Sequence, residues 1–144
     1  MKARMNRRLF QILIFPCLCL MASITSSYAQ EAKPKPASIE MAIDFGDGLI
    51  WTFSDIQHTS KMTIMDAMNI ARARTKRPLR FSHKGAGESA FLISIDDSAN
   101  EGGGRSSRNW FYRVNHELGD QSFGLKQLKP GDKVLWHFGK YVPE

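Results

Sequence analysis

Cysteine is nearly absent from this chain of 144 residues, and its two cysteines, Cys17 and Cys19, both lie within the first 29 residues. The rest of the chain therefore has no thiol for a disulfide or for a cysteine-based metal site. It also lacks any apolar run of the roughly 20 residues that a membrane-spanning helix needs. Apolar residues make up 42% of the chain and charged residues 24%, values typical of one folded globular domain.

The first 29 residues have the pattern of a secretory signal peptide. Residues 1–8 carry four basic side chains and no acid, residues 9–21 are almost continuously apolar, and residues 22–29 are mostly small or polar. We predict cleavage before Gln30 and a product that is periplasmic or extracellular, with an uncleaved anchor as the alternative. Residues 30–38, with two prolines, are predicted to be an extended linker, and residues 39–144 a single domain.

The excess of positive charge belongs mostly to this leader. The whole chain has 20 basic and 14 acidic residues, a formal charge of +6. Without residues 1–29 the balance is 16 − 14 = +2. A nucleic-acid-binding function loses its main support, because such proteins are strongly basic.

Hydrophobic periodicity predicts an α+β fold. Residues 39–45 and 49–56 alternate around a Gly-Asp-Gly turn, which indicates an antiparallel hairpin. Residues 63–75 then show helical spacing, with a capping-box pattern at Thr63 and Asp66. Residues 91–95, 110–114 and 133–138 are predicted strands, and a short strand is possible around Phe81.

One helix can cover only one face of a sheet. We therefore predict a β-grasp (ubiquitin-like) fold, a mixed four- to five-stranded sheet with the helix packed across one face. The last strand would return parallel to the first in the middle of the sheet. Its apolar residues suit a strand that is buried on both faces, and His137 is the exception.

Four segments in this order resemble the transcobalamin-like C-terminal domain, a β-grasp family of unknown function in exported bacterial proteins. They are the hairpin 39–53, the helix start 63–68, the strand 91–96, and the pair 110–115 with 128–136. The family usually has Gly after Asn115, whereas this chain has His116, so the turn type there is open. In transcobalamin the domain helps to enclose cobalamin together with a helical domain. The resemblance thus implies corrinoid binding only by analogy of fold.

Aromatic residues on the predicted strands are the main candidates for a binding surface. Trp51, Trp110, Tyr112 and Trp136 would pack in the core, against Met65 and Met68, or one or two of them would stand on the open sheet face. On that face they could stack against a sugar, a corrin-like ring or a partner side chain. We group Trp110, Tyr112, Trp136 and Asn115 as candidate ligand-binding residues.

A basic run without acids spans residues 72–84 and is either a solvated helix end or a docking patch for an anionic surface or an acidic partner. Its candidate docking residues are Arg72, Arg74, Arg77 and Arg80, with Lys76 and Lys84 beside them.

The sequence contains no recognisable motif of a catalytic or metal-binding site. His58, His83, His116 and His137 are scattered, although the last two could approach if their strands pair. Asp96, Asp97 and Glu101 lack the regular spacing of a calcium loop, and Gly102–Gly104 lacks the strand and helix of a phosphate loop. We therefore predict a non-enzymatic binding or interaction module without catalytic residue, metal or cofactor. Corrinoid binding and a small envelope enzyme are the alternatives.

Overall fold

The computed structural model describes residues 37–104 and 106–142. The predicted signal peptide and residues 30–36 of the predicted linker lie outside the described residues. No helix within the described ranges is long and apolar enough to cross a membrane. In chain order the elements are β1 (Ser38–Asp44), β2 (Ile50–Gln57), α1 (Ile64–Arg72), β3 (Phe81–Lys84), η1 (Gly87–Ser89), β4 (Phe91–Ile95), β5 (Ser98–Ala99), β6 (Asn109–Val114), β7 (Glu117–Leu118) and β8 (Lys133–Gly139).

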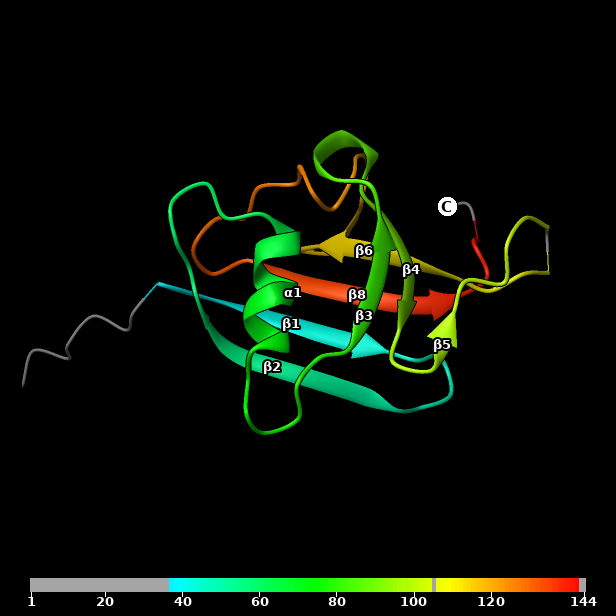
Figure 1. The fold of residues 1–144 in the computed structure, drawn as a ribbon, viewed down its shortest axis with the longest axis horizontal. Helices are drawn as coiled ribbons and strands as arrows, with labels where there is room; N and C mark the ends of the chain where they lie inside the picture. Colours follow the sequence, from blue (N-terminus) through cyan, green and yellow to red (C-terminus); the bar gives the residue numbers. More distant parts are fainter. Residues whose placement is uncertain (1–36, 105, 143–144) are drawn as a thin grey trace, which may run out of the picture. The chain divides into compact units, whose positions relative to one another are not determined.

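The main layer is a five-stranded sheet in the order β2-β1-β8-β6-β7 (Figure 1). β8 lies in its centre, parallel to β1 and antiparallel to β6. The predicted α+β class with one helix is therefore confirmed, as are the opening hairpin and the parallel pairing of the first and last strands.

A second layer covers one face of this sheet. It consists of α1 and a separate small sheet in the order β3-β4-β5, both drawn in front of the five strands in Figure 1. Buried residues of both units join one core with residues of β1, β6 and β8. The second sheet was not predicted. Strands were expected around Phe81 and over residues 91–95, but periodicity does not show that they pair in a sheet of their own.

The helix begins where its capping residues place it. Thr63 Oγ1 accepts a hydrogen bond from the Asp66 N–H, and the Asp66 carboxylate accepts one from the Thr63 N–H, so the predicted capping box is present. The helix ends at Arg72, earlier than the predicted Thr75. Ile64, Ala67, Met68 and Ala71 form its buried face.

The central strand β8 is buried on one face rather than on both, contrary to the prediction. Val134, Trp136 and Phe138 are buried, whereas Leu135 and His137 are only half-buried. In the described part of the chain the covering layer lies on one side, so alternate β8 side chains face out. His137 is accommodated there by a hydrogen bond from Nδ1 to the Asp44 carboxylate, 3.0 Å away on β1.

Candidate functional site

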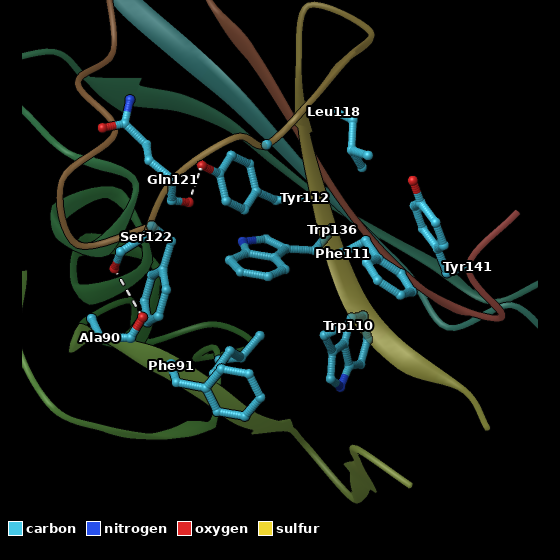
Figure 2. Close-up of a pocket in the computed structure, with 13 residues that line it drawn as sticks. Ala90, Phe91, Trp110, Phe111, Tyr112, Leu118, Gln121, Ser122, Trp136 and Tyr141 are labelled. Carbon is cyan, nitrogen blue, oxygen red and sulfur yellow. Dashed lines mark hydrogen bonds between the residues drawn. The ribbon is translucent and has the colours of Figure 1, made fainter. Parts of the chain in front are cut away.

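The candidate site is a pocket of about 360 Å³ between β4, β6 and the loop that follows β7. We call it the β4–β6 pocket. Its lining is mostly aromatic and contains no charged side chain (Figure 2). The residues are Ala90, Phe91, Leu92, Trp110, Phe111, Tyr112, Leu118, Gly119, Gln121, Ser122, Phe123, Trp136 and Tyr141.

Three of the four predicted ligand-binding residues line this one pocket. Trp110 and Tyr112 come from β6 and Trp136 from the neighbouring β8, where Tyr112 and Trp136 face each other in register. The Tyr112 and Trp136 rings meet edge to face, with centroids 5.4 Å apart. They lie on the covered face of the sheet and not on the open face, because they alternate in step with the buried Val114 and Val134. Their role in binding stays a prediction.

One wall of the pocket is a loop held against Tyr112. The Tyr112 hydroxyl donates to the Gln121 carbonyl at 2.6 Å, and burial raises the pKa of the phenol. A Cβ added at Gly119 would overlap the Tyr112 ring, so a larger residue here would force the ring to move. Ser122 Oγ lies 2.7 Å from the Gly87 carbonyl and 2.8 Å from the Ala90 carbonyl, which ties the same loop to η1 and β4.

The Asn100 side chain, which is not part of the pocket lining, joins β4 to β6. Its amide group donates to the Leu92 carbonyl on β4 at 2.7 Å, and its oxygen accepts from the Trp110 N–H on β6 at 2.8 Å. One side-chain amide thus bridges the two strands where no strand lies between them.

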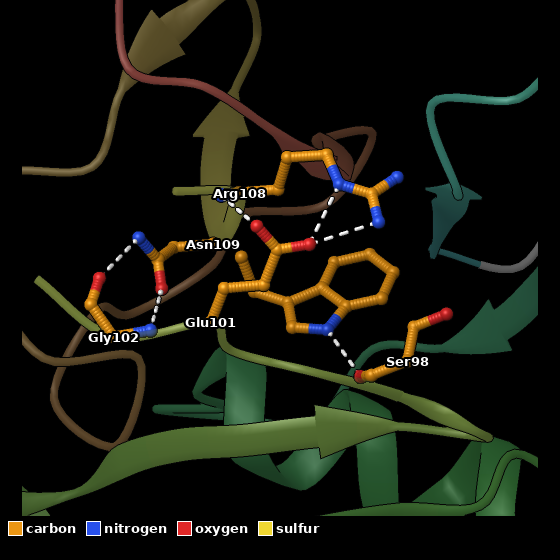
Figure 3. Close-up of polar contacts among 6 residues, drawn as sticks. Ser98, Glu101, Gly102, Arg108 and Asn109 are labelled. Carbon is orange, nitrogen blue, oxygen red and sulfur yellow. Dashed lines mark hydrogen bonds and ion pairs between the residues drawn. The ribbon is translucent and has the colours of Figure 1, made fainter. Parts of the chain in front are cut away.

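Polar contacts fix the start of β6 beside this bridge (Figure 3). The Glu101 carboxylate accepts from the Arg108 backbone and guanidinium, which lowers the pKa of Glu101. Asn109 exchanges two hydrogen bonds with Gly102, and Trp110 Nε1 donates to the Ser98 carbonyl at 2.9 Å.

Trp136 carries a buried donor that has no partner. Its side chain is 2% exposed, and within the described residues Nε1 has no hydrogen-bond acceptor. A buried donor without an acceptor costs free energy in a folded protein.

Asn115, the fourth predicted ligand-binding residue, lies in the β6–β7 turn, outside the lining of the pocket. Its side chain donates to Asp132 and accepts from the Lys133 N–H at 2.9 Å. Asn115 and His116 both have positive φ, 51° and 75°, as a two-residue hairpin turn of type I′ requires. Asn115 therefore holds the turn against the start of β8.

The predicted basic patch divides into braced and less constrained cations. Arg72 donates to the Phe81 carbonyl and stacks over its ring, Arg74 donates to the Ser54 carbonyl, and Arg80 pairs with Asp96. Arg77 lies over the Trp51 ring, 5.5 Å from its centroid. The Arg74 bond covers a carbonyl of the edge strand β2, a common protection of exposed sheet edges.

The histidines do not converge. His137 pairs with Asp44 in the middle of the sheet, and His116 lies in the turn beyond the far end of β6. In residues 37–104 and 106–142 no three His, Cys, Asp or Glu side chains are grouped as a metal ion would require. Asp96 and Glu101, two of the three acids of the calcium-loop alternative, bond instead to Arg80 and Arg108, and Asp97 lies 3.9 Å from the Arg80 guanidinium.

Several residues that line the pocket were not predicted from the sequence. Phe91 and Tyr141 are 53% and 55% exposed and line it, as does Phe111. An apolar residue at an outward position of a strand was the available signal for Phe91 and Phe111. Nothing in the sequence identified Asn100 as a bridge.

Comparisons with known proteins give a family and a fold. Residues 62–140 match the family described as "Domain of unknown function (DUF4430)". No curated protein sequence matches the chain. Among solved structures, a candidate metal-binding protein from Ruminococcus gnavus ATCC 29149 is similar with a TM-score of 0.55 and 12% identity, over 72% of this chain and 97% of that one. At this identity the likeness shows a shared fold.

Proposed function

The chain belongs to the DUF4430 family, and we propose that it is a non-enzymatic binding module that holds an uncharged apolar or aromatic group in the β4–β6 pocket. The observation that carries the proposal is the convergence of Trp110, Tyr112 and Trp136 on one uncharged cavity of about 360 Å³. A volume in this range and an apolar lining with few polar groups are typical of small-ligand sites.

The finer classification as a β-grasp domain of the transcobalamin-like type belongs to this proposal. It is supported by the parallel β1–β8 pair at the centre of the sheet and by the helix across one face. Export through the signal peptide is part of the same proposal, and it rests on the leader pattern of residues 1–29.

The proposal is tested by titration with N-phenyl-1-naphthylamine, an uncharged aromatic probe, followed by probe emission and tryptophan quenching. Phe91→Ser should weaken binding about tenfold, because it removes a half-exposed ring from the lining. Ile50→Ser is the matched control, since Ile50 is similarly exposed at 57% but lies on β2 outside the pocket. Absence of binding at high micromolar probe, or equal weakening by both variants, would contradict the proposal.

Corrinoid binding is the second candidate, favoured by the aromatic lining. A corrin is larger than this pocket, so only its rim would enter. Calorimetric titration with cobalamin tests it, and no heat together with unchanged tryptophan emission would remove it. An enzyme is less well supported, because no histidine or acidic side chain lines the β4–β6 pocket.

A further inference from the structure

The β4–β6 pocket passes around an open strand edge. Successive side chains of a strand point to opposite faces of the sheet, so Phe111 faces away from Trp110 and Tyr112. All three nevertheless line the same pocket. Figure 2 shows Phe111 and Tyr141 on one side of β6 and Tyr112 on the other. A cavity can contact both faces of a strand only by running across its edge, so the edge of β6 is accessible here.

β7 covers only the last part of this edge, where it pairs with Arg113 and Val114. On the opposite edge, residues 110–112 of β6 pair with β8. The Asn115 N–H donates to the Lys133 carbonyl at 2.9 Å, which fixes the alternation of the β6–β8 hydrogen bonds. By that alternation the main-chain groups of residues 110 and 112 point away from β8, into the open edge.

Two of these four outward groups are already bonded. The Trp110 N–H donates to Asn100 Oδ1, and the Tyr112 carbonyl accepts from the Gly119 N–H at 2.8 Å. The other two are the Trp110 carbonyl and the Tyr112 N–H, and neither has a partner in the part of the chain that the structure describes. An acceptor and a donor therefore flank Phe111 on the open edge.

This arrangement matches one residue of a parallel strand. In a parallel pair, the N–H of a residue donates to the carbonyl of the residue that precedes the one it faces. Its carbonyl accepts from the N–H of the residue that follows the one it faces. From this geometry, and resting on the proposed function of the pocket, we infer that the natural ligand is an extended peptide segment that adds parallel to β6. Its central residue would face Phe111, and the residues on either side would point towards Trp110 and Tyr112.

The lining also restricts the side chains of the peptide. The side chains of the first and third peptide residues enter the half of the pocket that Trp110 and Tyr112 line. The central side chain lies beside Phe111, Leu118 and Tyr141. No charged residue lines the half with Trp110 and Tyr112, so the first and third peptide residues should be uncharged and apolar. On the other side of β6, Phe111, Leu118 and Tyr141 also line a second pocket with Arg113 and Lys140, so the central side chain should be apolar where it contacts the rings and lies near these cations. Main-chain bonds would then supply affinity and alternate side chains specificity, as in other cases of strand addition.

The experiment uses blocked pentapeptides with threonine at both ends and valine, leucine or phenylalanine at the three central positions. Binding to the protein is measured by calorimetry, and hydrogen exchange of the Tyr112 amide by NMR. Each binding peptide is compared with versions N-methylated at one residue in turn. Methylation of the residue that faces Phe111 should weaken binding about tenfold, whereas methylation of its neighbours, whose N–H groups point away from β6, should have little effect. The Tyr112 amide should exchange more slowly in the complex.

Equal affinity of all N-methylated versions, or an unchanged exchange rate at Tyr112, would overturn the inference. If no peptide binds while N-phenyl-1-naphthylamine does, strand addition is wrong and the pocket remains a small-ligand site. If neither binds, the proposed function itself fails.

Discussion

At the scale of single residues, Tyr112 links the pocket, the strand and the loop wall. Burial raises the pKa of its phenol, so the folded state holds this proton more tightly than the unfolded chain does. The free energy of unfolding should therefore fall as the pH rises above about 10, the usual pKa of tyrosine. Tyr112→Phe should lower stability by about 1 kcal/mol at neutral pH, because the bond to Gln121 is lost, and should make the alkaline decline shallower.

Urea unfolding across the alkaline range measures both effects. Tyr141→Phe is the control, since Tyr141 is half-exposed and should keep the decline of the unmodified protein. An identical alkaline slope in Tyr112→Phe would show that another group is responsible.

His116 occupies a left-handed position, with φ of 75°, that favours glycine. A side chain with a Cβ adopts this region at a cost, which glycine avoids. His116→Gly should therefore stabilise the protein by about 0.5–1 kcal/mol in chemical denaturation, less the greater flexibility of glycine in the unfolded chain. His83→Gly, an exposed change within β3, should instead destabilise it. A loss of stability in His116→Gly would mean that the imidazole contributes more than its backbone strain costs.

At the scale of elements, α1 depends on its first residues. It has only nine residues, too few for a stable isolated helix, and its capping box satisfies donors that would otherwise have no partner. Thr63→Ala should lower the free energy of unfolding by about 1 kcal/mol. Thr75→Ala, beyond the helix end, should change it by less than about 0.5 kcal/mol. Similar losses in both variants would indicate that the capping box is not what stabilises the helix.

In the basic run of residues 72–84, some cations hold backbone carbonyls of the described residues and others do not. Because Arg72 and Arg74 hold carbonyls of β3 and β2, we expect polyanion docking, if it is the function of the patch, to depend on Lys76 and Arg77. The double change Lys76→Ser and Arg77→Ser should abolish salt-sensitive binding to a sulfated polysaccharide and leave the thermal midpoint nearly unchanged. Arg72→Ala should lower that midpoint. Polyanion binding that is unchanged by salt and by the double change at Lys76 and Arg77 would exclude a docking patch here.

At the scale of the whole molecule, the sequence predicted what periodicity encodes. The alternation in β1 and β2 and the helical face of α1 were sufficient for the class and the hairpin. The apolar residues of β8 led to the parallel central pair, although the strand is buried on one face only. Periodicity cannot show which strands share a sheet, so the second sheet was missed. Periodicity also placed Trp110, Tyr112 and Trp136 on strands, but it did not show whether they lie on the covered or the open face of the sheet. The open edge of β6 depends on the length of β7 and on the Asn100 bridge, which are tertiary properties.

The leader pattern predicts which form of the chain is recovered after export. If residues 1–29 are a signal peptide, protein recovered from the cell envelope or medium should begin near Gln30. Because both cysteines lie in the leader, thiol reagents should then leave the recovered protein unlabelled, whereas the uncleaved chain would take up two labels. Intact mass spectrometry before and after labelling distinguishes the two forms. A recovered protein whose mass includes Cys17 and Cys19 would show that the leader is retained, as an uncleaved anchor.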